Sequence, residues 1–566
     1  MLKNITLKIK SKITGKPVII TPGRIVVVVG PNSSGKSKFL SELANVFSGG
    51  LGTLSQKSPK HLVVDGAQVS DQAEREFADY IISQAEVSSK GTYFAIPNGS
   101  GSHSASTLCP PHCITPTERE QFVKDWIAGN PEAYSVWAYH LRGTMRHDLL
   151  HVHNLDTNNK KEFPLYSIGS DRVQLNIFLK LFYDAVGQFV LFDFTTGHIR
   201  IKLSQTRVPD EHQFSASPEA REFAFGLPGI ETMSDGYRSL AGLYLACTAS
   251  KYRLLLVDET EAFLHPPLQR QIGNQLAKLA NENGGTLVSV THSDAILEGC
   301  LASELPLTIL RMNNEGGEFS AEVLDPDLVR IFTRRPILRA TSALEALFCQ
   351  TAVVCEGESD FVVYSEINHR LEQANDLAVP DSKFISTFGK GKVHHVIKPL
   401  RQMGIPAAAI CDFDLLTGEG FSALMEAANM PTSTHRHLRD NAGNALVRLP
   451  TTETEPAKQL AERKKLAKNR GLGAFFGTDR VLVRDLLHTC AQYGVFICPV
   501  GEIEQWYSAS TTKERFVSEY FEYLGDDPDN PNYKRPATDG IWQFMREIAV
   551  WTKDPNRKGM PYDKDV

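Results

Sequence analysis

Short, almost wholly apolar runs recur along this sequence, and each leads into glycine or polar residues. Runs of about five such residues are typical of strands buried on both faces of a parallel sheet. The clearest of them occupy residues 25–29, 253–257, 286–290, 351–355, 407–411 and 495–499. Because amphipathic stretches with helical spacing separate these runs, the pattern predicts an α/β fold.

The alternation falls into two regions. Residues 1–340 predict one α/β domain and residues 341–510 a second, smaller one, whereas residues 511–566 predict helices and a polar tail. A segment at about 90–165 interrupts the first region with Gly-, Ser-, Pro- and Thr-rich sequence. We therefore expect this segment to be an insertion that lies outside the main sheet.

Composition excludes some classes of protein. The chain has 566 residues, nine cysteines, 60 basic and 66 acidic side chains, and a net charge of −6. The cysteines are too sparse for a disulfide framework, and no apolar run approaches a membrane span. We expect a cytoplasmic protein with no membrane partner. The charge gives no support for nucleic-acid binding, although a local basic channel or metal ions could still serve a phosphate.

The first apolar run leads into a phosphate-binding loop. Residues 30–37 read G-P-N-S-S-G-K-S, which matches G-x-x-x-x-G-K-S between a predicted strand and a predicted helix. Lys36 would neutralise the β- and γ-phosphates of ATP, and the Ser37 hydroxyl would bind Mg²⁺. The predicted ATP-binding residues here are Gly30, Asn32, Ser33, Ser34, Gly35, Lys36, Ser37 and Lys38.

Two further strands end in residues that fit the same site. Asp258 and Glu259 follow the strand at 253–257, so Asp258 is expected to hold Mg²⁺ and Glu259 to polarise the attacking water. His292 follows the strand at 286–290, where the ligand crevice of an open α/β sheet is expected, and could sense the γ-phosphate.

A second anion-binding segment precedes a long apolar helix. Ser234 and Gly236 lie at the expected start of that helix, and residues 231–239 resemble the signature segment of ABC-type ATPases. Residues 258–266 resemble the DExEAxLHP stretch of the RecF, SMC and OLD-like branch of those ATPases. The resemblance implies that one subunit closes over ATP held by another, and hence a homodimer or higher homo-oligomer. An ABC transporter subunit would share the loop, but the second α/β domain argues against one.

Three strands of the second domain deliver carboxylates at their ends. Glu356 and Asp360 follow the strand at 351–355, Asp412 and Asp414 the strand at 407–411, and Glu502 and Glu504 the strand at 495–499. Parallel strands would bring these ends to one sheet edge. Oxygen ligands in such a cluster suit Mg²⁺ or Mn²⁺, and two ions there could promote phosphodiester hydrolysis.

The pattern E-G after one strand and D-x-D after a later one resembles the TOPRIM fold shared by topoisomerases, bacterial primases and certain nucleases. Glu356-Gly357 and Asp412-x-Asp414 carry it. An ABC-type ATPase followed by a Rossmann-like TOPRIM domain resembles the OLD (overcoming lysogenization defect) family, as does the joining stretch at 339–360. The resemblance covers most of residues 1–505.

The resemblance implies a metal-dependent DNA nuclease of the kind that acts in anti-phage defence, alone, with a helicase-like partner or beside a retron RNA/DNA complex. By position, Glu356 would be a metal ligand or general base, and Asp360, Asp412, Asp414 and Glu502 or Glu504 further ligands. The segment at about 90–165 would mediate dimerisation. The family commonly places a transition-state lysine near the C-terminus; Lys513 is preferred here because it follows Gly-Glu-Ile-Glu on a predicted helix.

Other functions stay open at this point. Residues 458–470 predict a basic helix that either tracks phosphates or simply faces solvent, and residues 389–392 (G-K-G-K) either meet a phosphate or form a plain turn. A RecF- or SMC-like repair clamp with an inert TOPRIM domain, a primase or topoisomerase, and a nuclease acting on RNA are the alternatives. Intact carboxylates argue against the clamp, and neither a primase zinc module nor a topoisomerase tyrosine domain stands out.

Overall fold

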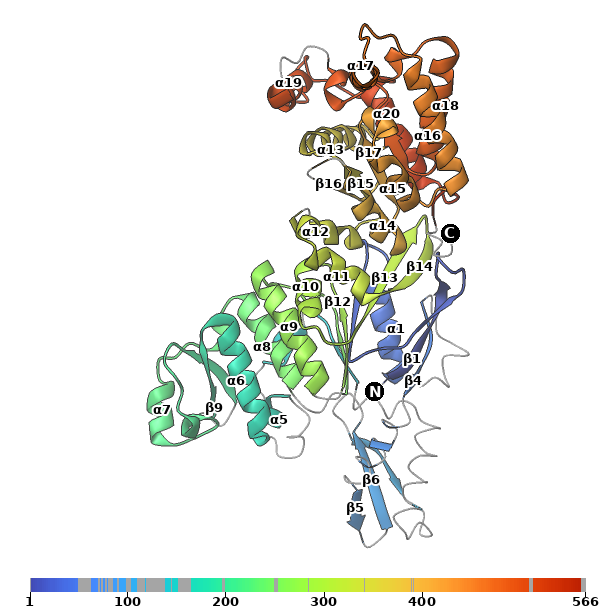
Figure 1. Cartoon of the computed structure of the whole chain (residues 1–566). Coiled ribbons are helices and arrows are strands. Elements are labelled where there is room, and N and C mark those ends of the chain that lie inside the picture. Colours follow the sequence, from blue (N-terminus) through green and yellow to red (C-terminus); the bar gives the residue numbers. More distant parts are fainter. Residues whose placement is uncertain are drawn as a thin grey trace. The chain divides into compact units, whose positions relative to one another are not determined.

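The computed structural model contains helices and strands that fall into an N-terminal and a C-terminal group along the chain (Figure 1). It describes residues 2–48, 63–69, 72, 75–76, 79, 85–88, 91–97, 103–108, 118, 138–143, 145–150, 164–195, 199–248, 253–282, 285–340, 342–387, 389, 391–507 and 513–560. These residues divide into two compact units: unit 1 comprises Met1–Ser11 and Gly15–Pro326, and unit 2 comprises Lys12–Thr14 and Asp327–Val566. In the described part of the chain, no helix combines the length and the apolar character that a membrane span requires.

Unit 1 is built on a mixed sheet in the order β2-β1-β14-β13-β3-β12-β11-β8, with β4 paired to β1. Its strands are β1 (Leu2–Lys10), β2 (Pro17–Ile20), β3 (Ile25–Val29), β4 (Val64–Val69), β8 (Ala138–Leu141), β11 (Leu254–Val257), β12 (Thr286–Val290), β13 (Leu307–Glu315) and β14 (Glu318–Leu324). Parallel pairing joins β13, β3, β12, β11 and β8, so their carboxyl ends meet at one edge.

Unit 1 also contains helices and two smaller sheets among its described residues. The helices are α1 (Lys36–Ser48), α4 (Met145–Asp148), α5 (Pro164–Ser170), α6 (Arg172–Val186), η2 (Asp210–His212), α7 (Pro218–Ala224), η3 (Ile230–Thr232), α8 (Asp235–Thr248), α9 (Pro266–Glu282) and α10 (Asp294–Ala302). Two separate sheets contain β5 (Ala85–Ser88), β6 (Gly91–Pro97) and β7 (His103–Leu108), and β9 (Phe189–Asp193) and β10 (Arg200–Ser204).

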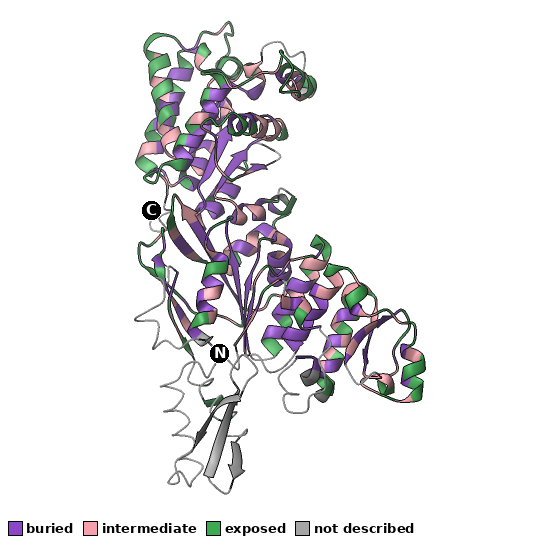
Figure 2. Cartoon of the chain, turned by 180° about the vertical axis from the view of Figure 1, so that it is seen from behind, coloured by how far each residue is buried: buried purple, intermediate pink, exposed green. Residues whose placement is uncertain are grey.

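The hydrophobic core of unit 1 accounts for the apolar sequence of its central strand, β3. All five residues of β3 are buried, and Val26 and Val28 pack in one cluster with Phe39 and Leu43 of α1. Figure 2 shows buried residues along the central strands and exposed residues on the outer faces of the helices. Burial on both faces accounts for the unbroken run of β-branched residues.

The segment at about 90–165 lies largely outside the described residues, and with it the predicted dimerisation role. Where it is described, β6 and β7 belong to a separate sheet, but β8 pairs with β11 in the main sheet. The expectation that the whole segment stays outside the main sheet is therefore wrong for β8. Four residues with one buried leucine carry too little pattern to identify such a strand.

Unit 2 is built on a parallel sheet in the order β16-β15-β17-β18. These strands are β15 (Thr351–Cys355), β16 (Ser382–Ser386), β17 (Ala407–Cys411) and β18 (Val495–Ile497). The chain leaves β15 for β16 on one side and returns to β17 on the other. The carboxyl ends of β15 and β17 therefore form a switch point, where open α/β sheets bind ligands.

Helices surround this sheet. They are α11 (Pro326–Arg334), α12 (Pro336–Ala340), η4 (Ala343–Phe348), α13 (Glu358–Gln373), α14 (His394–Gln402), η5 (Phe413–Thr417), α15 (Gly420–Ala427), α16 (Thr432–Val447), α17 (Pro456–Arg470), η6 (Gly471–Ala474), α18 (Gly477–Gln492), η7 (Ile503–Trp506), α19 (Lys513–Leu524) and α20 (Gly540–Lys553). Trp542, Phe544 and Ile548 of α20 lie in the same buried cluster as Val353 of β15 and Tyr364 of α13. The C-terminal helix is thus part of the core of unit 2.

Candidate functional site

The loop after β3 forms a cradle of backbone groups. The buried Lys36 ammonium donates hydrogen bonds to the carbonyl oxygens of Gly30 and Pro31, at 2.8 and 2.7 Å. Gly30 has φ +142°, and a Cβ there would lie 2.1 Å from the Met312 carbonyl oxygen, so only glycine fits. The loop therefore has the glycine-dependent shape and the buried lysine of a phosphate site.

The other residues predicted to bind ATP in this loop differ in exposure and in their contacts. Asn32 and Ser33 are exposed, Ser34 is buried and accepts a hydrogen bond from Lys36 at 3.3 Å, and Gly35 has φ +91°. The Lys38 ammonium lies 3.6 Å from the Glu42 carboxylate on α1. Lys38 could therefore serve a phosphate through its backbone N–H at the helix N-terminus, while its side chain pairs along the helix.

Ser37 and Asp258 meet beside the loop. The Ser37 hydroxyl donates to Asp258 Oδ1 at 3.3 Å, although the two residues come from α1 and from the end of β11. The turn is fixed from two sides, since the Asp258 N–H donates to Leu141 of β8 and the Thr260 N–H to Val290 of β12. A hydroxyl and a carboxylate in contact are the pair that P-loop enzymes use to hold the magnesium of ATP.

Glu259 follows in an exposed position with φ +50°. A non-glycine residue in the left-handed region is strained by about 1–2 kcal/mol and is held there by its surroundings. The neighbouring Glu261 orients the end of β12, because its carboxylate accepts hydrogen bonds from the Thr291 hydroxyl at 2.6 Å and the His292 N–H at 2.7 Å. The structure thus brings Asp258, Glu259 and His292 to one edge of the sheet.

Ser234 and Gly236 lie at the start of α8, as the sequence predicts. Ser234 is exposed, and a Cβ at Gly236 would come within 2.8 Å of the Phe263 carbonyl oxygen. The signature segment is therefore packed against the turn that follows Glu259. An exposed serine at a helix N-terminus is suited to an anion from outside the unit.

Sequence reasoning missed Arg146 of α4, which is completely buried. Its guanidinium donates to the carbonyl oxygens of Asp258 and Glu259 at 2.9 and 2.7 Å, and to the Ser239 hydroxyl of α8 at 2.9 Å. Burial lowers its pKa to about 10, so it stays charged at neutral pH. Arg146 joins the strained turn at Glu259 to α8. No local motif marks it, because all its partners are distant in sequence.

Replacing Arg146 by methionine should lower the free energy of unfolding of unit 1 by about 3 kcal/mol, since the buried Ser239 hydroxyl and two partly buried carbonyl oxygens lose their charged donor. ATP hydrolysis should fall with it. Urea unfolding and steady-state ATPase assays would measure both effects. The control is Arg142→Met, an exposed change in the same segment that should alter neither. Equal stability of the two variants would contradict this role.

The imidazole of His292 resists protonation. Burial and the nearby Lys36 charge lower its pKa below the ordinary value of 6.5. The unfolded chain therefore binds this proton more readily than the folded protein, and stability is lost as the pH falls through 6.5. A His292→Asn variant should gain thermal stability relative to the wild type between pH 7.5 and 5.5. A difference in Tm that stays constant over this range would contradict the expectation.

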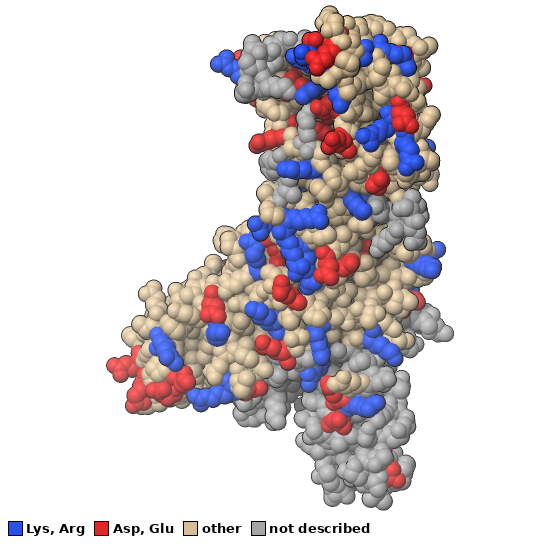
Figure 3. Space-filling view, in the orientation of Figure 1, with Lys and Arg blue, Asp and Glu red and all other residues tan. Residues whose placement is uncertain are grey.

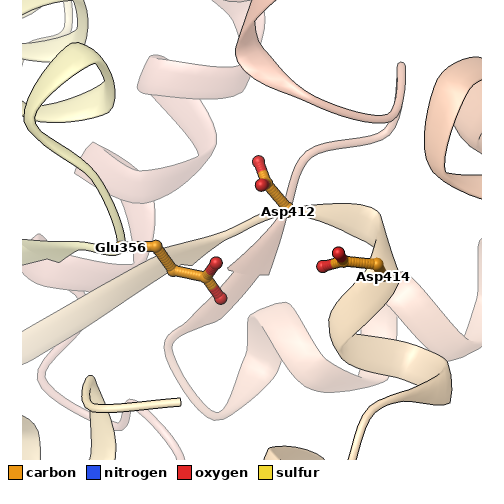
Figure 4. A group of neighbouring side chains, drawn as sticks. All are labelled: Glu356, Asp412 and Asp414. Carbon is orange, nitrogen blue, oxygen red and sulfur yellow. The ribbon is translucent and has the colours of Figure 1, made fainter. Parts of the chain in front are cut away.

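In unit 2, three carboxylates come together at the switch point. One oxygen from each of Glu356, Asp412 and Asp414 lies within 4.8 Å of the others. Glu356 follows β15, and the two aspartates follow the neighbouring strand β17. Figure 4 shows the Glu356 and Asp414 carboxylates pointing toward each other. Glu356 is buried, so the cluster concentrates negative charge where solvent screens it poorly.

The donor set of this acidic cluster fits a hard divalent cation. It offers only carboxylate oxygens, which Mg²⁺ and Mn²⁺ prefer. Cys411 lies beside it, but burial raises the pKa of this thiol well above its ordinary value, so it stays protonated. A cation would also relieve the repulsion among three close carboxylates.

The remaining predicted ligands are placed differently. The Gly357 N–H donates to Asp360 Oδ2 at 2.9 Å, so this carboxylate caps α13. The Glu502 carboxylate lies 2.9 Å from the Lys468 ammonium, and Glu504 is half-buried on η7. Among the described residues, none of these three joins the group formed by Glu356, Asp412 and Asp414. Lys513 begins α19, but its side chain lies outside the described residues, as does Lys390 of the G-K-G-K segment.

The basic helix predicted at 458–470 is α17, and two of its lysines contact other parts of unit 2. The Lys464 ammonium donates to the Thr417 carbonyl oxygen at 3.1 Å, and Lys468 reaches the acidic cluster one turn later. Lys465 is exposed on the same helix. A purely solvated face therefore does not describe α17, because Lys468 makes carboxylate contacts that the sequence pattern did not reveal.

Two family models match the chain. One, described as "AAA domain, putative AbiEii toxin, Type IV TA system", matches residues 221–298, which include α8, the Asp258–Glu259 turn and His292. The other, described as "Overcoming lysogenization defect protein-like, TOPRIM domain", matches residues 347–414, which include Glu356, Asp412 and Asp414. The predicted order, an ATPase domain followed by a TOPRIM domain in an α/β fold, is confirmed.

Two solved structures are distantly similar to the chain. A "SmcHead bound to the C-winged helix domain of ScpA" is 14% identical, with 57% of this chain and 97% of that chain covered and a TM-score of 0.33. An SMC head domain from Thermotoga maritima is 13% identical, with 57% and 99% covered and a TM-score of 0.30. No curated protein matches the chain.

Proposed function

We propose that this chain, which joins an ATPase domain to an OLD-like TOPRIM domain in the order of the overcoming lysogenization defect family, is an ATP-controlled, divalent-metal-dependent DNA endonuclease. The observation that carries the proposal is the cluster of Glu356, Asp412 and Asp414 at the switch point of a parallel sheet. Three carboxylates this close are costly to a protein unless a cation binds them. A phosphodiester is the substrate class that such a cation would serve.

The acidic residues have distinct tasks in this proposal. Asp412 and Asp414 hold the cation from β17, and Glu356 either shares it or accepts a proton from the attacking water. A divalent cation bound there would supply Lewis-acid activation of the phosphate and a water of lowered pKa. Asp360 supports the site indirectly, because its cap fixes the start of α13 directly after Glu356.

The ATPase domain controls this site in our proposal. Lys36 and the loop after β3 bind the phosphates, Ser37 and Asp258 hold Mg²⁺, and Glu259 orients the attacking water. The exposed Ser234 at the start of α8 supports closure of a second subunit over the nucleotide, and hence a homodimer. Arg146 then connects the segment that would contact a partner's nucleotide with the chain's own Glu259 turn.

DNA is proposed on the family resemblance rather than on surface charge. On the face drawn in Figure 3, lysine and arginine side chains are interspersed with acidic ones. Counter-ion release along a basic stripe is therefore not the main argument for the substrate. A role in anti-phage defence, with a helicase-like partner or a retron RNA/DNA complex, is proposed on the same resemblance, and plaque counts in cells with and without the gene would test it.

A substrate panel tests the proposed activity. Supercoiled plasmid, linear duplex, single-stranded DNA and RNA would be incubated with Mg²⁺, Mn²⁺ or EDTA, each with and without ATP. We expect metal-dependent cleavage of DNA that EDTA abolishes. Cleavage restricted to RNA would assign the RNA alternative. ATP hydrolysis with DNA binding but no cleavage in any condition would favour a clamp whose TOPRIM domain is inert.

A further inference from the structure

We propose that Lys468 is a built-in counter-cation of the acidic cluster, which holds Asp414 and Glu502 in place before a divalent metal arrives and competes with that metal. The inference rests on the proposed metal site and concerns how its affinity is set. The Lys468 ammonium lies 2.9 Å from Glu502 Oε1 and 3.7 Å from Asp414 Oδ2. Asp414 belongs to the acidic cluster, so one lysine links the cluster to an adjacent buried carboxylate.

The position of Lys468 is fixed by backbone packing rather than by the side chain alone. A Cβ at Gly501 would lie 2.2 Å from the Lys468 carbonyl oxygen, and one at Gly471 would lie 2.2 Å from the Pro499 carbonyl oxygen. The end of α17 and the turn before Glu502 therefore touch backbone to backbone. Glycines at both points, each with positive φ, permit this contact.

The same turn is tied to the aspartates. The Phe413 N–H donates to the Gly501 carbonyl oxygen at 2.9 Å, and Phe413 stands between Asp412 and Asp414. The Leu472 N–H donates to the Pro499 carbonyl oxygen at 2.8 Å, just after α17 ends. Backbone contacts around one turn thus hold the end of α17 beside Glu502 and the two aspartates, which keeps the Lys468 backbone close to these carboxylates.

The charge of Lys468 acts both on the buried Glu502 and on a divalent ion that approaches the acidic cluster. Glu502 is buried, and a buried carboxylate needs a cation or several hydrogen-bond donors. The lysine supplies that cation without a metal, but its charge also repels a divalent ion approaching Asp414. The metal-free fold therefore gains stability. The affinity for the divalent metal falls, so the site fills only at a higher free metal concentration.

Direct binding of Mn²⁺ tests this, because the readout does not depend on nuclease activity. Full-length protein without nucleotide would be titrated with Mn²⁺ and followed by electron paramagnetic resonance. Lys468→Met should tighten binding by at least about tenfold, since a repelling charge a few ångströms away is removed. Lys468→Arg, which keeps the charge, should stay within about threefold of the wild type. Asp412→Asn, which removes a ligand, assigns the signal to this site.

A matched control separates local from general charge effects. Lys465→Met removes the same charge from the exposed side of the same helix and should leave Mn²⁺ affinity unchanged. Without metal, Lys468→Met should lower the Tm by about 3 °C or more, because Glu502 keeps its charge without its partner. Adding Glu502→Gln to Lys468→Met should restore most of this loss.

The outcomes distinguish the inference from the proposed function. Mn²⁺ binding by the wild type with unchanged or weaker binding by Lys468→Met would overturn the counter-cation role alone. Equal tightening in Lys465→Met would also overturn it. If the wild type does not bind Mn²⁺ and Asp412→Asn gives the same resonance signal as the wild type, the metal site itself is overturned. The counter-cation role of Lys468 is then overturned with it.

Discussion

Replacing Glu356 by glutamine should reduce nuclease activity by about a hundredfold to ten-thousandfold, while ATP hydrolysis stays unchanged. The substitution preserves the volume of a buried side chain at the end of β15 and removes only its charge. One oxygen of Glu356 lies within 4.8 Å of oxygens of Asp412 and Asp414, so its charge acts directly where the phosphate would be cleaved. Initial rates on supercoiled plasmid would measure the loss.

The control lies two residues away. Glu358 is exposed at the start of α13, and Glu358→Gln should retain activity within about twofold, as is usual for surface substitutions. Full activity of Glu356→Gln, beside cleavage that EDTA still abolishes, would place the nuclease site elsewhere in the chain. Loss of ATPase activity together with cleavage would instead point to a folding defect.

The same variant distinguishes the two tasks that Glu356 could have. If Glu356 is a metal ligand, Glu356→Gln should weaken Mn²⁺ binding, and excess Mn²⁺ should restore part of the rate. If it is the general base, Mn²⁺ binding should persist and the rate should instead depend more steeply on hydroxide concentration. Metal titration and a pH profile of the rate would therefore assign the role.

The strands could be read from the sequence because their signals are local. Thr286–Val290, Thr351–Cys355 and Ala407–Cys411 have the predicted bounds, since each is a short buried run of mostly apolar residues that leads into polar ones. Parallel pairing then brings the residues after them to one edge. The contact between Ser37 and Asp258 and the closeness of Asp412 to Glu356 both follow from this parallel topology.

Two of the interactions that the sequence concealed are non-local. Arg146 binds carbonyl oxygens in a turn more than a hundred positions away, and such acceptors leave no trace in side-chain pattern. Lys468 reaches Glu502 because two glycine-permitted backbone contacts bring α17 against a distant turn. Asp360 stands in the expected motif, but its position at the start of α13 lets it cap that helix. Packing decides the contacts of Arg146 and Lys468, whereas the cap made by Asp360 is local and was hidden by its place in the expected metal-binding motif.

Glu259→Gln should lower the turnover number for ATP by about a hundredfold or more, while the affinity for ATP stays within about threefold of the wild type. Glutamine is as compatible as glutamate with φ +50°, and the carbonyl oxygen that Arg146 binds is unchanged. The turn should therefore keep its shape and lose only the charge that orients water. Steady-state hydrolysis and equilibrium binding of ATP would measure the two quantities.

A matched control is Glu304→Gln, an exposed glutamate of unit 1 that also has positive φ, at +57°. It should retain wild-type turnover. Glu259→Gln is expected to bind ATP without hydrolysing it, so the variant should stay in the ATP-bound state. Its nuclease rate therefore shows whether bound ATP activates or inhibits DNA cleavage. Faster cleavage than the wild type with ATP would mean that ATP binding opens the nuclease, and slower cleavage that it restrains it. Unchanged ATP turnover in Glu259→Gln would show that Glu259 is not part of the hydrolytic site. If ATP turnover is lost but DNA cleavage is unchanged, ATP hydrolysis and DNA cleavage are not coupled.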